Sequence, residues 1–339
     1  MLALLQIAAV TLAFLFVGFS SIWWAFAMWY QIPANRVLKI LSIISWIVFT
    51  TWVLITLWQG HIAISLLPFA LAFSCLLVWW HRIAPSNDRI WADDVAQMTT
   101  GTVENNIVTL HNVRNFMWRS NNDYTARWET RHYDLNQLRS VDMIMSYWKG
   151  AAIAHMLISF GFENEQHVVF SVEIRREKTE EFSEIGGFFK EFELSVIAAD
   201  ERDVIRVRTN VRGENTYLYN VHMPIPAMRS LFLAYVEEAN SLVQKPRFYN
   251  TITANCTTLV YHMMKRIVGY LPLSHRLLFS GYLPEYVYHV GGLDQRYSLK
   301  ELRTWGHITA RAEAADQSDD FSIQIRRGIP YVEQAVIDR

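Results

Sequence analysis

The chain has 339 residues, which is long enough for more than one domain. Its formal net charge of -1 provides no excess of basic side chains, so we expect no nucleic-acid partner. Hydrophobic residues make up 52% of the chain, but their distribution is uneven, because nine of the thirteen tryptophans precede residue 92.

Three apolar segments occupy the first 82 residues, at roughly 2–30, 37–58 and 62–80. Each contains about the 20 apolar residues that a helix needs to cross a bilayer. A cleaved signal peptide would have a basic start and a shorter apolar stretch than the first segment has. We therefore expect three transmembrane helices within residues 1–83, with the lipid bilayer as a partner.

From about residue 84 the composition becomes that of a soluble domain, which we place at 84–310, followed by a C-terminal tail at 311–339. Alternation of apolar and polar residues predicts strands, and helical spacing predicts a helix that Pro226 opens, with a second helix after Asn255. The predicted strands are 106–112, 128–133, 153–160, 168–175, 194–199 and 204–209, and the first helix is 226–243. Strands in the first half and helices in the second favour an α+β fold.

Cys256 is the most informative residue of this domain. Asn255 is a suitable N-cap, so the thiol falls in the first turn of a helix, where the macrodipole lowers its pKa and favours the thiolate. The other cysteine, Cys75, lies in an apolar segment, so Cys256 has no evident disulfide partner. Val260 and Met263 follow on the same helical face, which predicts that this face packs against the sheet.

A predicted hairpin supplies a possible base for this thiol. The strands at 153–160 and 168–175 flank a polar turn, and when the turn is centred on Asn164, His155 falls opposite Glu173. Opposed residues of an antiparallel pair point to the same face, with Cβ atoms about 5 Å apart. A register shift of one residue would place Val172 or Ile174 there instead.

Together these residues predict a Cys–His–acid site, with Cys256 as nucleophile, His155 as base and Glu173 as orienting acid. Backbone N–H groups at the helix start, with Asn255 or Tyr249, are candidates for an oxyanion hole. Arg175 is a candidate contact for lipid phosphate, although pairing with local carboxylates is the alternative for it and for the arginines at 202–208. No HExxH-type spacing occurs, so we expect neither a metal nor a cofactor.

Each residue also has a purely structural interpretation. A lone cysteine is more often a small core residue, a strand histidine is more often a satisfied core residue, and Glu173 fits a solvated carboxylate. The functional interpretation depends on their joint occurrence.

Several motifs resemble the Lnb-type N-terminal periplasmic domain family, in matching order over about residues 90 to 305. These motifs are Asn112 to Phe116, Asp134-Leu135, Ala154 to Phe162, Ser171 to Arg176, Asp200 to Arg206 and Phe248 to Thr258. The resemblance implies a papain-like fold in which histidine precedes cysteine, as in permuted NlpC-type domains. It also implies acyl transfer, since the named members are bacterial lipoprotein N-acyltransferases. Cys256 would then accept the acyl group, with His155 as its base and Glu173 as its orienter. The apolar segments precede this domain, whereas in those enzymes they follow it.

We accordingly expect a membrane-anchored cysteine acyltransferase that works through an acyl-Cys256 thioester, with phospholipid and lipoprotein substrates. Two alternatives remain open: a cysteine peptidase or amidase of the cell envelope, and a non-catalytic membrane-tethered scaffold. The expected location is the bacterial inner (cytoplasmic) membrane, multi-pass, with a periplasmic catalytic domain. The few loop charges, Arg36 and Lys39 before the second span and His81 and Arg82 after the third, favour the opposite side.

Overall fold

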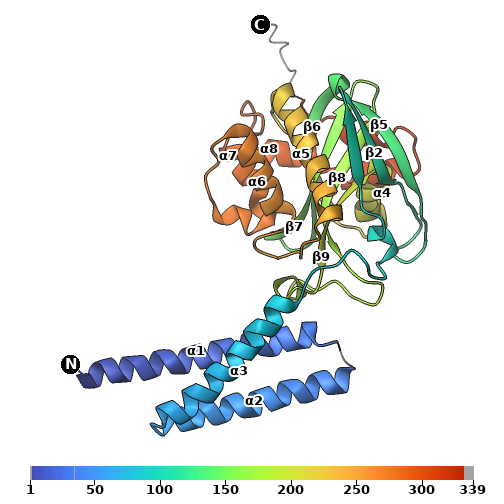
Figure 1. Cartoon of the computed structure of the whole chain (residues 1–339). Helices are drawn as coiled ribbons and strands as arrows, with labels where there is room; N and C mark the ends of the chain where they lie inside the picture. Colours follow the sequence, from blue (N-terminus) through green and yellow to red (C-terminus); the bar gives the residue numbers. More distant parts are fainter. Residues whose placement is uncertain (1, 34, 332–339) are drawn as a thin grey trace. The chain divides into compact units, whose positions relative to one another are not determined.

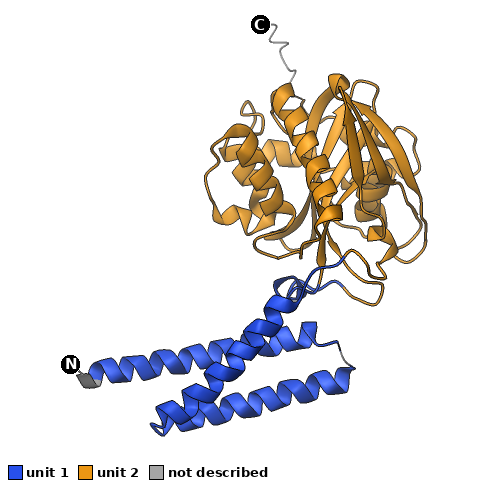
Figure 2. Cartoon of the chain, viewed as in Figure 1, with its two compact units in different colours: residues 1–86, 182–191 blue, residues 87–181, 192–339 orange. Residues whose placement is uncertain are grey.

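The computed structural model describes residues 2–33 and 35–331. The chain forms two compact units, one of residues 1–86 and 182–191 and the other of residues 87–181 and 192–339 (Figure 2). The first unit therefore includes a short segment that the sequence places far from its helices.

The first unit contains three helices: α1 (Leu2–Gln31), α2 (Arg36–Trp58) and α3 (Ile62–Arg82) (Figure 1). All three are long and apolar enough to cross a membrane, as the sequence predicts. Aromatic side chains, among them Trp24, Trp46 and Phe69, are buried where the helices meet. Most other apolar side chains of the helices face outward, which is the arrangement expected when lipid replaces water as the solvent.

A sheet of eight strands forms the centre of the second unit. Its strands are β1 (Thr100–Glu104), β2 (Ile107–Arg114), β5 (Trp128–Asp134), β6 (Leu138–Lys149), β7 (Ile153–Phe162), β8 (His167–Arg175), β9 (Glu193–Ala199) and β10 (Asn215–Asn220). Their order is β1-β2-β9-β8-β7-β6-β10, and β5 pairs with β2 beside this path. Strands β6 to β9 and β10 pair antiparallel, so β7 and β8 lie in the interior of the sheet. The short strands β3 (Met117–Trp118) and β4 (Tyr124–Thr125) form a separate pair.

Helices cover both faces of the sheet (Figure 1). They are α4 (Glu201–Arg206), α5 (Ile225–Gln244), α6 (Cys256–Val268), α7 (Leu283–His289), α8 (Leu299–Gly306), α9 (Thr309–Ala315) and α10 (Phe321–Arg326). Alternate residues of β7 serve the two faces: Met156 and Ile158 pack in one core with α5 to α8, and Leu157 packs in another with α4, α9 and α10. The fold is α+β, preceded by three long apolar helices, as predicted.

The predicted strand at 204–209 is wrong. These residues form the end of α4 and a π-helical turn, Val207–Val211. The β-branched residues there suggested a strand, but Asp200 caps a helix by accepting a hydrogen bond from the backbone N–H of Arg202. Glu201 is buried together with Val204 and Ile205, three and four residues later, which is helical spacing, so tertiary packing decides the structure.

The C-terminal boundary also differs from the prediction. Instead of a tail that begins at residue 311, the described residues up to 331 continue the fold of the second unit. Phe321 and Ile325 are fully buried. Arg326 is buried as well, and it forms ion pairs with Asp142 and Glu201.

Candidate active site

The β7–β8 hairpin has the register that brings His155 and Glu173 together. Leu157 pairs with Ser171 at the end of the ladder, and two residues further along the strands the same register brings His155 opposite Glu173. His155 Nε2 lies 3.2 Å from Glu173 Oε1. Neither Val172 nor Ile174 takes the place of the carboxylate.

Ser171 completes this part of the site. Its hydroxyl lies 2.8 Å from His155 Nε2 and donates a hydrogen bond of 2.6 Å to Glu173 Oε1. Because Nε2 is engaged by Ser171 and Glu173, the other ring nitrogen, Nδ1, is left for the thiol. The carboxylate and the hydroxyl therefore fix the orientation of the imidazole.

Cys256 is the first residue of α6, and the structure brings it to His155. Asn255 caps the helix: its side-chain oxygen accepts hydrogen bonds from the N–H groups of Thr257 and Thr258, both at 2.8 Å. The imidazole of His155 and the backbone N–H of Met156 in β7 both interact with the sulfur, and both lower the pKa of Cys256. The nucleophile, base and acid candidates are thus adjacent, although Cys256 and His155 are about a hundred residues apart in sequence.

The electrostatics favour a thiolate–imidazolium pair. Burial would raise the pKa of Cys256, but the hydrogen bond and the charge of His155 outweigh it and lower the pKa below its ordinary value. Burial would likewise lower the pKa of His155, but the Glu173 carboxylate and the bond to Cys256 raise it to about 9. The pKa of buried Glu173 is held well below its usual range by His155 and Arg208. A charged Cys–His pair at neutral pH is the form that a thiol nucleophile requires.

The backbone N–H of Cys256 is a candidate donor for an oxyanion. At the first position of α6 it has no partner within the helix, and among the described residues no hydrogen bond engages it. Asn255 is less suitable, because its oxygen caps the helix and its Nδ2 donates to the carbonyl of Thr251. Tyr249 remains a candidate, since the negative charges of Cys256 and Glu173, together with burial, raise the pKa of its hydroxyl.

Arg175 does not join this group. Its guanidinium donates to the carbonyls of Val95 and Ala96 and lies 4.3 Å over the ring of Trp91. Burial lowers its pKa to about 10. Arg175 therefore holds the segment before β1 and is not available for a lipid phosphate.

Arg208 is the site residue that the sequence did not reveal. Its Nη2 lies 3.2 Å from Glu173 Oε1, and its Nη1 lies 3.6 Å from the carboxylate of Glu214. The side chain is largely buried. The role of Arg208 was not predicted, because this residue lies in the segment that was wrongly predicted to be a strand. Ser171 could have been predicted, since it lies two residues before Glu173 and therefore on the same strand face.

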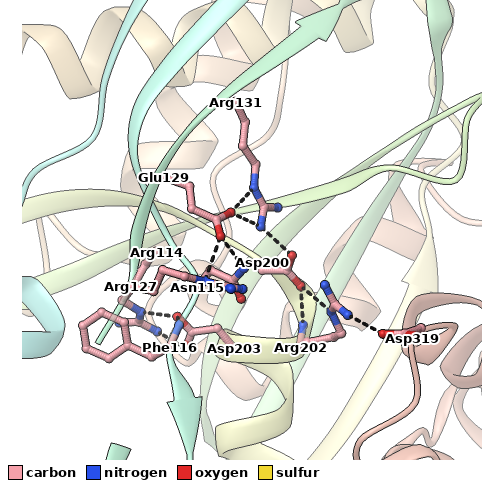
Figure 3. A network of polar contacts seen from close by, with 10 residues as sticks. All are labelled: Arg114, Asn115, Phe116, Arg127, Glu129, Arg131, Asp200, Arg202, Asp203 and Asp319. Carbon is pink, nitrogen blue, oxygen red and sulfur yellow. Dashed lines mark hydrogen bonds and ion pairs between the residues drawn. The ribbon is translucent and has the colours of Figure 1, made fainter. Parts of the chain in front are cut away.

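A polar network holds α4, the helix that leads to Arg208 (Figure 3). Buried Asp203 accepts hydrogen bonds from Arg114 Nε and from the backbone N–H of Phe116. Arg131 bridges Glu129 and Asp200. These residues include the Asn112–Phe116 and Asp200–Arg206 motifs, so those motifs serve the structure that supports the site. The arginines at 202 and 206 pair with carboxylates, of Asp200 and Asp316 respectively, which was the alternative to binding phosphate.

An apolar cavity of about 510 Å³ lies next to the candidate site, and its described lining includes the residues that follow His155 and Cys256 but not those two residues themselves. It lies between β6, β7 and the helices of the same face, and its lining includes Met156 and Thr257, the neighbours of the sulfur from β7 and α6. Val260, Met264, Leu231 and Ile158 continue the apolar lining. The buried hydroxyl of Thr257 interacts with the thiol and contributes to the lowered pKa of Cys256. The volume falls within the range of small-molecule sites.

In the part of the chain that the structure describes, no three His, Cys, Asp or Glu side chains gather as the ligands of a metal ion would. His155 and Glu173 are committed to each other and to their neighbours.

The protein has three apolar helices, which define it as membrane-anchored. Its α+β domain has a candidate cysteine site, in which a thiol lies beside an imidazole–carboxylate pair. Residues 124–281 match the family model described as Lnb N-terminal periplasmic domain, which confirms the resemblance. The matched region contains Cys256, His155 and Glu173. Residues 124–281 are thus similar to the Lnb N-terminal periplasmic domain, and the three helices that precede them are long and apolar enough to cross a membrane. No curated protein and no solved structure matches the chain.

Proposed function

We propose that this protein is a cysteine acyltransferase of the bacterial inner membrane, multi-pass, with its active site in the periplasmic domain. The acyl donor is a phospholipid and the acceptor is the amino group of a lipoprotein. The apolar cavity lined by Met156 and Thr257, which follow His155 and Cys256 in the chain, carries this proposal, because an acyl chain needs an apolar site, whereas a peptide substrate needs polar partners for its backbone.

The reaction would proceed in two steps. The Cys256 thiolate attacks the ester carbonyl of the donor, and the N–H of Cys256 stabilises the oxyanion. The tetrahedral intermediate collapses as the imidazolium of His155 gives its proton to the leaving alkoxide, which releases a lysolipid and leaves a thioester on Cys256. The amine then attacks the thioester, His155 takes the proton of the amine, and the thiolate returns.

Intact-mass spectrometry of the full chain after incubation with phospholipid vesicles tests this reaction. The expected result is one acyl adduct on Cys256, which also forms in the Cys75→Ser variant. The His155→Ala variant should show no adduct. If catalytically active protein forms no adduct with lipid, the phospholipid donor is excluded.

A substitution in the cavity tests where the acyl chain lies. Met264 lines the cavity from α6. Replacing it with the larger Trp should reduce the space for the far end of the acyl chain. We expect Met264→Trp to retain acylation by short-chain donors and to lose most of it with long-chain donors, since each buried methylene contributes about 0.8 kcal/mol. The control is Met117→Trp, an exposed site on β3, which should leave the chain-length preference unchanged.

The same triad also fits a cysteine peptidase or amidase of the cell envelope. Labelling with a peptide electrophile instead of a lipid-ester probe would favour that alternative. A non-catalytic scaffold predicts that Cys256→Ala keeps full function.

A further inference from the structure

The segment between β8 and β9 belongs structurally to the membrane helices. Residues 182–191 form one compact unit with α1 to α3, although both of their flanking strands lie in the sheet (Figure 2). The segment folds on itself: Gly186–Phe188 is a 3-10 turn, and the N–H of Gly186 donates to Ser183 Oγ at 2.9 Å.

Phe189 is the apolar attachment of this segment. Its side chain is buried in the core of the helical unit. Its ring stacks on those of Tyr30 and Phe26, each with a centroid distance of 5.6 Å. These contacts place the segment at the C-terminal part of α1.

Polar contacts attach the segment to the ends of two helices. Gln31, the last residue of α1, donates to the carbonyls of Phe189 and Lys190, both at 2.8 Å. Lys190 Nζ donates to the carbonyls of Trp80 and Ile83 at 2.7 and 3.3 Å, where the last carbonyls of α3 lack helical partners. A cation at this position also opposes the negative end of the helix dipole. The segment thus lies where α1 and α3 both end, which is the boundary of an apolar span.

The outward side of the segment carries large apolar side chains. Phe182 is 58% exposed, Ile185 49% and Phe188 39%. The same segment contains Glu184, Lys190 and Glu191, so its composition mixes aromatic and charged residues as interfacial segments do. Water is a poor solvent for three such neighbouring side chains, and the adjoining helix surface requires lipid.

We infer that residues 182–191 form an interfacial anchor that inserts Phe182, Ile185 and Phe188 into the headgroup layer of the bilayer, on the side where α1 and α3 end. The occupant of this surface is lipid, since the surface is continuous with that of the spanning helices. Residues 176–181 connect the anchor to β8, the strand of Glu173. This inference does not depend on acyltransferase activity.

Site-directed fluorescence of the full-length protein tests the anchor. In a Cys75→Ser, Cys256→Ser background, Ile185→Cys carries an environment-sensitive label, and the protein is reconstituted into vesicles of phosphatidylethanolamine and phosphatidylglycerol. We expect nitroxide groups near the lipid headgroups to quench the label strongly, and aqueous iodide to quench it weakly. Leu71→Cys, on the exposed surface of α3, provides the reference for a lipid-facing label.

The matched control is Ile107→Cys, an isoleucine of similar exposure at the start of β2. Iodide should quench the label there several-fold more than at Ile185. Equal iodide quenching at both positions, with no quenching of the Ile185 label by headgroup nitroxides, would overturn the anchor.

Discussion

At the scale of single residues, the charge state of Cys256 is the property that determines reactivity. The lowered pKa of Cys256 depends on the imidazolium of His155, so the thiolate should be present at pH values at which an ordinary cysteine is still protonated. The rate of alkylation by iodoacetamide follows the thiolate fraction. In the Cys75→Ser protein we expect the pH at which the alkylation rate is half-maximal to lie below the value for a free cysteine.

In the His155→Ala variant the pH of half-maximal alkylation should be higher, because burial then acts on the thiol without a compensating cation. If this pH is the same in both proteins, the ion pair does not exist.

Substitutions of Glu173 and Arg208 should shift the high-pH side of the pH–activity profile in opposite directions. The proposed acyl transfer requires the proton of His155, so the rate of Cys256 acylation should fall as the pH rises through about 9. The carboxylate of Glu173 raises the pKa of His155, and the charge of Arg208 lowers it. We therefore expect the high-pH side of the profile to move to lower pH in Glu173→Gln and to higher pH in Arg208→Met.

The control for Arg208 is Arg206→Met on the same helical segment. Arg206 is also largely buried, but its carboxylate partner is Asp316. This variant should lose stability without moving the high-pH side of the profile. If the Arg208 and Arg206 variants have the same pH profile, Arg208 has only a structural role.

At the scale of elements, the N-terminal cap of α6 links stability to the position of the nucleophile. Asn255 and Thr258 form a capping box, with each side chain bonded to the backbone of the other. Asn255→Ala should reduce the free energy of unfolding by about 1 kcal/mol. Because the first turn carries Cys256, the alkylation rate at neutral pH should fall as well.

Helix α8 provides a matched control, since Ser298 and Glu301 form the same kind of capping box away from the thiol. Ser298→Ala should cost a similar amount of stability, measured by thermal unfolding, and should leave alkylation of Cys256 unchanged. If Cys256 is alkylated at the same rate in both alanine variants, the Asn255 cap does not affect the reactivity of the thiol.

The sequence predicted the elements whose patterns are local. The register of His155 and Glu173 followed from alternation and a short polar turn, and α6 followed from its cap. The long strand β6 was not predicted, because Arg139 and Asp142 interrupt its apolar pattern, and Asp142 is satisfied by Asn220, Arg326 and Tyr331 from distant parts of the sequence. Likewise, Arg208 and the attachment of Phe189 depend on contacts between segments far apart in sequence, which periodicity does not report.

At the scale of the whole molecule, the C-terminal helices complete the second face of the sheet. The sequence instead predicted a tail from residue 311 onward. The packing of α10 shows whether these residues belong to the folded unit or extend from it. Phe321 is fully buried in the core shared with α4 and the sheet. Phe321→Ala should therefore reduce the free energy of unfolding by about 3 to 5 kcal/mol, as for other large core residues.

Ile323, on the same helix, is 38% exposed, and Ile323→Ala should change stability by only about 0.5 kcal/mol. Thermal unfolding of the detergent-solubilised chain measures both, because loss of Phe321 should lower the transition of the whole α+β unit. If instead α10 is an appendage, both variants should unfold at the wild-type temperature. The ion pairs of Arg326 with Asp142 on β6 and Glu201 on α4 predict that α10 unfolds together with the sheet, and therefore with the strands that hold His155 and Glu173.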